Sequence, residues 1–336
     1  TNPDMLHTGI LPHHASWARL FSNLKYVVID ELHTYRGVFG SHLANVIRRL
    51  KRIALFHKSR PTFIFASATI GNPAEHAERM IGDCVHLIDS SGSPTGKKHV
   101  FLYNPPVVNE ELGIRQSCIK VAVRLTSELA QAGVSTIVFG QSRNNVEVML
   151  KYLRESLSRA GVSQSAIQGY RGGYLPEKRR AIEAGLRNKE ILVVVATNAL
   201  ELGIDIGALD AVVCAGYPGS IASVWQRFGR GGRRGADSLA LLVTNSSPLN
   251  QFFAMQPEML VQGDIEQARI DPDNVEVLVQ HLKCAAFELP FESTERFGDL
   301  PSEAVQDALD FLVDHRVVHP VTESDGATTY HWSTDS

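Results

Sequence analysis

Short, almost entirely apolar runs recur along the chain and are separated by longer stretches of mixed character. The apolar runs are rich in Val and Ile and lack polar alternation; they occupy residues 26–30, 62–67, 136–140, 191–197, 210–216 and 239–244. Runs of this kind are typical of strands that are buried on both faces of a parallel sheet. The pattern therefore predicts buried parallel strands at these positions.

The stretches between the runs have the apolar spacing of amphipathic helices. They cover residues 41–56, 118–131, 144–158 and 177–186. Strands that alternate with helices indicate βαβ units, and βαβ units build an open sheet with helices on its faces. The fold class predicted from the pattern is α/β.

Two changes of character divide the chain into three segments. The turn-rich stretch SSGSPTGKKH at 90–99 is expected to end one α/β lobe, and helices predominate after about Gly263. Helices at 275–287 and 302–314 precede VVHPV and TTYHW, which flank the turn ESDGA. Helix followed by hairpin suggests a small winged-helix-like domain. We therefore expect domains at 1–92, 93–262 and 263–336.

Composition and charge exclude several classes of protein. The 336 residues are 44% hydrophobic and 21% charged, which is ordinary for a soluble globular protein. No apolar run is long enough to span a membrane, and the N-terminal sequence has no signal-peptide pattern. A net charge of −3 excludes a uniformly basic coat but not a local basic groove. Because it begins at Thr1 without a Met, we expect the chain to start inside a longer protein.

The cysteines carry no signal of a disulfide or metal framework. They lie far apart at Cys84, Cys118, Cys214 and Cys284, among apolar neighbours. We expect each to be a small buried side chain, and a reducing cytoplasm to be the location.

An acidic pair, Asp30 and Glu31, follows the first apolar run directly. At the carboxyl end of a parallel strand, such a pair faces the crevice where ligands bind. Asp30 would supply the hard oxygen ligand that Mg²⁺ needs, and Glu31 would activate the attacking water of phosphoryl transfer. The alternative is that the pair only caps the next helix.

Two hydroxyl-bearing motifs follow other apolar runs. Ser67-Ala68-Thr69 could relay the nucleotide state by hydrogen bonds, although by itself the motif is weak and an ordinary Ser/Thr turn is the favoured interpretation. Further along, Thr197 lies at a strand–helix junction suited to phosphate, Gly203 permits close backbone approach, and Asp205 could accept a ribose hydroxyl bond. The alternative there is a glycine turn with a solvated Asp.

The stretch from Gln226 to Gly235, QRFGRGGRRG, is the most specific motif. Arg230 and Arg233 are three residues apart and would clamp a γ-phosphate as arginine fingers, which contribute about 10³–10⁵ in rate. The alternative is a solvated basic loop.

In this order, the four motifs resemble the motor core of superfamily-2 helicases of the D-E-x-H type. The resemblance covers about residues 1–260. It implies two RecA-like lobes that bind ATP between them and nucleic acid across the top. By this match Asp30, Glu31, Arg230 and Arg233 are catalytic, His33, Gly203, Asp205 and Gln226 also bind the nucleotide, and Ser67 and Thr69 couple the two activities. The cofactors implied are ATP and Mg²⁺, with Asp30 as the metal ligand.

The same resemblance implies which residues contact nucleic acid. Thr1-Asn2-Pro3-Asp4 looks like the family's backbone-contacting motif, and Ser142-Arg143 resembles its fourth motif. The further contacts expected are Tyr170, which would stack on a base, and Arg171, Gly172 and Thr197. Of the other basic groups, Arg48, Arg49, Lys51 and Arg52 are expected to form a solvated helix face. A solvated face is at least as good a reading as phosphate binding for Lys178–Arg180, and Trp225 is expected to pack in the core.

A narrower resemblance is carried by DELHTYRGVFGSHLANVIRRLKRI, ASATIGNPAEHA, YRGGYLPEKRR and HLKCAAFELP, which look like the MrfA/YprA-type subgroup. Its members are DNA repair ATPases, some of them 3′→5′ helicases, with a cysteine-rich zinc-binding domain. One departure is the absence of a G-x-x-x-x-G-K-[ST] loop from these 336 residues. We therefore expect the first lobe to be truncated and this chain alone to hydrolyse ATP poorly.

The function predicted is that of a fragment of an ATP-dependent helicase that acts on DNA in repair and tracks along a single strand. Two alternatives stay open: a non-catalytic nucleic-acid-binding module built on helicase-like lobes, and an RNA helicase.

Overall fold

The computed structural model describes residues 1–90, 92, 96–201, 206–207, 209–232, 235–322 and 327–333. They form two compact units: unit 1 comprises Thr1–Asp89 with Gln267–Ser336, and unit 2 comprises Ser90–Glu266. The three-part division at 92/93 and 262/263 stays a prediction, because a division into compact units does not test boundaries drawn from the sequence. Within the described ranges, no helix combines the length and the apolar character needed to cross a membrane.

Unit 2 is built on a six-stranded parallel sheet with the strand order β3-β10-β9-β6-β8-β7. Its strands and paired ribbon are β3 Lys98–Tyr103, β4 Val107–Asn109, β5 Ile114–Arg115, β6 Thr136–Phe139, β7 Ile167–Tyr170, β8 Val193–Ala196, β9 Ala211–Ala215 and β10 Ser238–Val243. The four apolar runs predicted here as strands are confirmed as β6, β8, β9 and β10. The edge strands β3 and β7 were not predicted, because Lys98 and His99 interrupt one and Gln168 and Gly169 the other.

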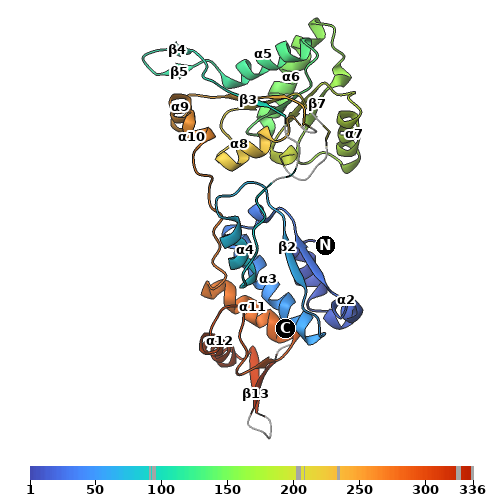
Figure 1. Cartoon of the computed structure of the whole chain (residues 1–336), viewed down its shortest axis with the longest axis vertical. Helices are drawn as coiled ribbons and strands as arrows, with labels where there is room; N and C mark the ends of the chain where they lie inside the picture. The colour runs from blue at the N-terminus through green and yellow to red at the C-terminus, as the bar shows by residue number, and fades with distance from the viewer. Residues whose placement is uncertain are drawn as a thin grey trace. The chain divides into compact units, whose positions relative to one another are not determined.

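Helices cover both faces of this sheet (Figure 1). They are α5 Cys118–Gln131, α6 Arg143–Arg159, η4 Gln164–Ala166, α7 Pro176–Arg187, η5 Asn198–Leu200, α8 Ile221–Phe228, α9 Pro248–Met255 and α10 Glu258–Val261. Val138 and Val195 pack with α5 and α6 on one face, whereas Ile137 and Val194 pack with α7 and α8 on the other. This two-faced burial is the reason that the strands read as continuous apolar runs, and the predicted α/β class is confirmed.

Unit 1 contains a much smaller parallel sheet, made of β1 and β2. Its N-terminal elements are α1 Pro3–Met5, η1 Leu6–Ile10, η2 His14–Trp17, α2 Ala18–Phe21, β1 Tyr26–Ile29, η3 Leu32–Thr34, α3 Gly37–Phe56, β2 Thr62–Phe65 and α4 Pro73–Ile81. Val27 and Phe63 pack against the core formed by α3 and α4, but Tyr26 is 63% and Val28 64% exposed. The prediction that these strands are buried on both faces is therefore wrong for the described residues, since only one face is covered.

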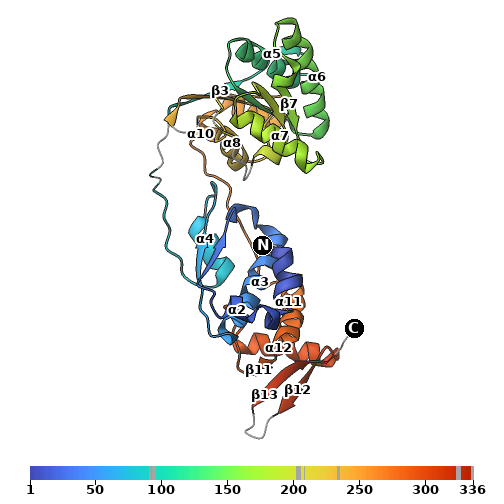
Figure 2. The ribbon, with the colours of Figure 1, turned by 90° about the vertical axis from the view of Figure 1, so that its right-hand side faces the viewer.

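The C-terminal part of unit 1 has the helix–hairpin character that the sequence predicted. Its elements are α11 Val275–Glu288, β11 Phe291–Glu292, α12 Ser302–Asp314, β12 Val318–Thr322 and β13 Thr328–Trp332. The strands form an antiparallel sheet in the order β11-β13-β12, and the two helices share an apolar core with it. The hairpin projects beside α11 and α12 in Figure 2. The winged-helix-like prediction is confirmed.

Arginines of α3 join it to the chain around α11. Arg49 forms a bidentate ion pair with Glu288, and the two side chains are 0% and 1% exposed. Arg48 donates to Asp273 over 2.7 Å, and Arg52 Nη2 donates to Glu295 Oε2 over 3.1 Å. The prediction of a solvated basic face is wrong here, because the acidic partners arrive from more than 200 positions later in the chain.

The cysteines fit their prediction only in part. Cys214 is buried in β9, whereas Cys84 is exposed and Cys118 and Cys284 are half-buried. All four are free thiols, and burial raises the pKa of Cys214 to about 12. Cys84 departs from the prediction because it follows α4 in an irregular stretch, where its apolar neighbours do not cover it.

Candidate nucleotide and nucleic-acid site

The acidic pair lies where β1 ends, and its backbone is strained. Glu31 has φ 54° and ψ 43°, a left-handed backbone conformation that residues other than glycine rarely adopt. Asp30 Oδ1 accepts a hydrogen bond from the Glu31 amide over 2.8 Å, and Leu32 N–H donates to Ala66 O over 2.9 Å. Such a conformation costs about 1–3 kcal/mol and is concentrated at functional sites. A helix cap does not require it, so the strain favours the functional interpretation.

His33 connects the acidic pair to the Ser-Ala-Thr motif. Its Nδ1 accepts a hydrogen bond from the Ala68 amide over 3.2 Å, and its Nε2 lies 3.6 Å from Glu31 Oε2. Because Nδ1 is the acceptor, the ring proton of the neutral histidine is on Nε2 and faces the carboxylate. Ser67 and Thr69, on either side of Ala68, are exposed on the bend after β2. The structure thus brings both motifs of unit 1 together through one imidazole.

Neighbouring groups respond to the same charges. Burial raises the pKa of Tyr35, and the carboxylates of Asp30 and Glu31 add to that shift. His76, on α4, is buried, and burial lowers its pKa. Both groups are expected to be neutral near pH 7, which leaves the carboxylates as the dominant charges here.

Asn72 is a site-adjacent residue whose side-chain contacts the sequence did not predict. It is the N-cap residue of α4, and its side chain bonds to the backbone of Ala268: Oδ1 accepts from Ala268 N over 2.8 Å, and Nδ2 donates to Ala268 O over 3.0 Å. A two-way bond of this kind mimics a strand pair. It anchors the segment that leads into the winged-helix-like region.

In unit 2, the motif after β8 contacts the arginine-rich motif after α8. Glu201 Oε2 accepts from Arg227 Nε over 3.0 Å, and Glu201 Oε1 accepts from Ser223 Oγ over 2.6 Å. Arg230 Nη2 donates to the Glu201 backbone oxygen over 2.6 Å. Arg230 is therefore held in a network rather than solvated, which excludes the alternative of a solvated loop for this residue.

Glu201 and Arg227 were not singled out from the sequence, although both lie inside the motifs. A charged residue embedded among buried apolar neighbours was the available signal, because such a group needs a partner. Gln226, on the same turn of α8, is half-buried. Gly203, Asp205 and Arg233 lie outside the described residues, so their predicted roles stay predictions.

The residues expected to contact nucleic acid in unit 2 gather at the carboxyl ends of β6, β7 and β8. Ser142 caps α6 by accepting from Asn145 N over 3.1 Å. Arg143 Nη2 lies 3.7 Å from where a Cβ on Gly172 would be, and Arg171 donates to Glu147 over 2.7 Å. The buried Thr197 caps η5 and donates its amide to Tyr170 O over 3.3 Å.

Burial decides the role of two aromatic residues for which base contact was considered. Tyr170 is 1% exposed and its hydroxyl donates to Glu183 over 2.7 Å, so the prediction that it stacks on a base is wrong. It is the last residue of β7 and faces the core. The glycines that follow Arg171 made it look like part of an exposed turn in the sequence. Trp225 packs edge-on against Phe228 and donates to Leu260 O, which confirms its predicted place in the core.

The remaining predicted contacts, Thr1 to Asp4, lie in unit 1. Asn2 caps the short helix α1 by accepting from Met5 N over 2.8 Å. Thr1, Asn2 and Asp4 are exposed. The motif is therefore structured and accessible, and its contact with nucleic acid stays a prediction.

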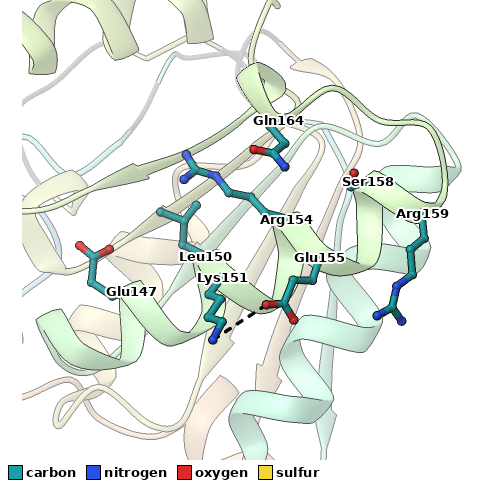
Figure 3. A pocket seen from close by; sticks show the side chains of 8 residues that line it. All are labelled: Glu147, Leu150, Lys151, Arg154, Glu155, Ser158, Arg159 and Gln164. Carbon is teal, nitrogen blue, oxygen red and sulfur yellow. Dashed lines mark ion pairs between the residues drawn. The ribbon is translucent and has the colours of Figure 1, made fainter.

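A cavity elsewhere in unit 2 holds none of the predicted site residues. Figure 3 shows that it runs along the outer face of α6 and ends at Gln164 of η4. Its cations and carboxylates are mixed, and Lys151 and Glu155 pair across one turn of the helix. Its lining offers no concentrated charge for a nucleotide.

Three family descriptions match successive parts of the chain. Residues 1–77 match the DEAD/DEAH box helicase family, 119–235 the helicase conserved C-terminal domain, and 270–333 the winged helix domain of the ATP-dependent helicase HRQ1. The chain therefore carries sequence of both helicase domains and of an HRQ1-type winged helix domain. The predicted resemblance, including its MrfA/YprA-type subgroup, is confirmed.

Individual helicases support the same assignment. The chain is 52% identical to the uncharacterized ATP-dependent helicase YprA of Bacillus subtilis, over 100% of this chain and 44% of that sequence. It is 41% identical to HRQ1 of Saccharomyces cerevisiae, over 88% of this chain and 29% of that sequence. The crystal structure of the DUF1998 helicase MrfA bound to DNA and AMPPNP matches 100% of this chain and 46% of its own with a TM-score of 0.94 and 52% identity. The chain thus spans less than half the length of these relatives.

Proposed function

We propose that the chain carries catalytic and strand-binding parts of an ATP-dependent DNA helicase. The observation that supports this most directly is the strained Glu31, whose carboxylate lies beside His33, while His33 binds the backbone of the Ser-Ala-Thr motif. Strain held at a carboxylate and linked to a second motif is expected for a catalytic base that reports on its ligand. A binding module without catalysis needs neither property.

ATP and Mg²⁺ fit the residues present. Asp30 is exposed, and the Glu31 amide engages only its Oδ1, which suits a hard oxygen ligand of Mg²⁺. Among the described residues, no group of three or more His, Cys, Asp and Glu is arranged to hold a metal. The site therefore suits Mg²⁺ held by one carboxylate, water and phosphate oxygens, which is its usual state with a nucleotide. When bound, the ion would neutralise charge on the phosphates.

In this proposal Glu31 orients the attacking water and accepts its proton, while Asp30 holds the metal. Arg230 and Arg233 stabilise the charge that develops on the γ-phosphate. Gln226, Gly203 and Asp205 complete the nucleotide contacts. Ser67 and Thr69, linked through Ala68 and His33, transmit the nucleotide state to the bound strand.

Single-stranded DNA is the proposed track. Thr1–Asp4 in one unit, with Ser142, Arg143, Arg171, Gly172 and Thr197 in the other, would bind phosphates through backbone amides, hydroxyls and cations, which needs no positive net charge. DNA is favoured over RNA because the similar MrfA structures are described as bound to DNA. DNA repair is the proposed process, in line with the subgroup.

The test is Glu31→Gln in the complete protein. The matched control is Glu111→Gln, which replaces an exposed carboxylate of unit 2 by the same carboxamide. Loss of the base is expected to lower kcat for ATP hydrolysis by at least about 10²-fold, while ATP affinity is retained. Unchanged turnover in Glu31→Gln would remove this residue from the mechanism. Unwinding of matched DNA and RNA duplexes by the wild type then decides the substrate, and activity on RNA alone would contradict the choice of DNA.

A further inference from the structure

Lys98 is a half-buried cation without an assigned role. It begins β3, and its side chain extends to the C-terminal end of α8 in the same unit. Its Nζ donates to the backbone oxygen of Phe228 and, over 3.3 Å, to that of Gly231. Burial lowers the pKa of Lys98. An ammonium group kept in such surroundings must gain from its carbonyl partners what it loses in hydration.

The two carbonyls, of Phe228 and Gly231, lie on either side of Arg230 in the sequence. Phe228 O also accepts the Gly231 amide over 3.2 Å, and Arg230 N–H donates to Arg227 O over 2.9 Å, so residues 227–231 form a tight turn at the end of α8. Carbonyl oxygens at a helix C-terminus carry partial negative charge that an adjacent cation stabilises. Lys98 thus holds both sides of the turn on which Arg230 is carried.

The guanidinium end of Arg230 is fixed independently, by the Glu201 backbone oxygen. A long side chain can be delivered accurately only when its backbone and its head group are both constrained, because each free rotation spreads the head group over several positions. Glu201 supplies one constraint and Lys98 the other.

We propose that Lys98 is a positioning residue, which fixes the Phe228–Gly231 turn so that Arg230 is presented to the nucleotide. Its kinetic consequence rests on the proposed function, because it matters for catalysis only if Arg230 acts on ATP. Its structural consequence, a rigid turn, does not depend on that function.

Lys98→Met tests the structural consequence, with Lys97→Met as the matched control because Lys97 is the exposed neighbour. The measurement is amide hydrogen exchange in the complete protein. We expect the Gly231 and Gly232 amides to exchange about tenfold faster in Lys98→Met than in Lys97→Met, with the central strands β6 and β9 unchanged. Equal exchange at Gly231 and Gly232 in both variants would overturn the proposal.

The kinetic consequence is tested by ATP turnover of the same variants. A misplaced arginine is expected to lower kcat about tenfold or more and to leave KM nearly unchanged, with partial recovery in Lys98→Arg, which keeps a cation for the carbonyls. Faster exchange at the turn with unchanged kcat would support Lys98 as the anchor of the turn and contradict the role proposed for Arg230. An equal fall of kcat in Lys97→Met would overturn the specific role of Lys98.

Discussion

Each unit contains a buried Arg–Glu pair, and the two pairs have different surroundings. In unit 1, Arg49 and Glu288 join α3 to α11, among histidines that include His7 and His281. In unit 2, Arg227 and Glu201 connect two motifs, and the backbone of Glu201 also holds Arg230. Burial of an ion pair is common to scaffold and site. What distinguishes the two pairs is what else each pair contacts: histidines in unit 1, and the predicted site residue Arg230 in unit 2.

The largest effect is expected from Arg49→Met. It leaves the Glu288 carboxylate buried without its partner, which typically costs about 3–5 kcal/mol of stability. Chemical unfolding of the purified protein measures it. The double variant Arg49→Met/Glu288→Met removes both charges and is expected to recover most of the loss. A single variant as stable as the wild type would show that the pair is not a structural junction.

Glu201→Gln is expected to have a smaller effect on stability, about 1–3 kcal/mol, because the amide oxygen can still accept from Arg227 while the amide NH2 donates to the Ser223 hydroxyl. Its effect on turnover separates the two pairs. By loosening the turn that holds Arg230, it should lower kcat about tenfold, whereas Arg49→Met should leave kcat of the folded protein unchanged. Steady-state ATP hydrolysis at a temperature where both variants are folded measures this, and equal kcat in the two would erase the distinction.

The last effect expected is a pH dependence of stability that arises from buried histidines of unit 1, His281 above all. Burial and then the charge of Arg49 lower the pKa of His281 to about 3, with His7, His42 and Arg48 adding to the shift. His281 also hydrogen-bonds to His42 over 3.0 Å, and Glu288 lies on the opposite side of Arg49. A folded-state pKa below the unfolded value of 6.5 means that the unfolded state binds more protons between about pH 3 and 6.5.

Stability should therefore be complete above about pH 6.5 and fall as the pH is lowered, by about 2 kcal/mol at pH 5. Urea unfolding between pH 5 and 8 measures this slope. His281→Gln should reduce it, while His86→Gln, at an exposed position, should not. A slope unchanged in His281→Gln would assign the effect to other groups, such as His76.

Much of unit 2 could be predicted from sequence, because burial on both faces gives β6, β8, β9 and β10 an unambiguous apolar pattern. α5 and α12 begin and end at the predicted residues. The same reasoning predicted too much burial for β1 and β2, where one face alone is covered. A run of apolar residues gives the character of a strand but not the number of its covered faces.

The motifs predicted which residues lie at the candidate site. Contacts between residues far apart in the sequence could not be predicted. His33 and Ala68 are 35 positions apart, and their hydrogen bond depends on the register of β1 with β2. Arg49 and Glu288 are 239 positions apart, so the arginines of α3 resemble a solvated face when read alone. Lys98 could not be singled out either, because its partners are backbone carbonyls and leave no mark in the residue types.

Asn72 links the chain just after the Ser-Ala-Thr motif to the segment around Ala268. It lies three positions after Thr69 and grips both backbone polar groups of Ala268, where the polypeptide re-enters unit 1. Any displacement of Asn72 must therefore either break two hydrogen bonds or move the backbone at Ala268 with it, so the positions of these two segments are coupled.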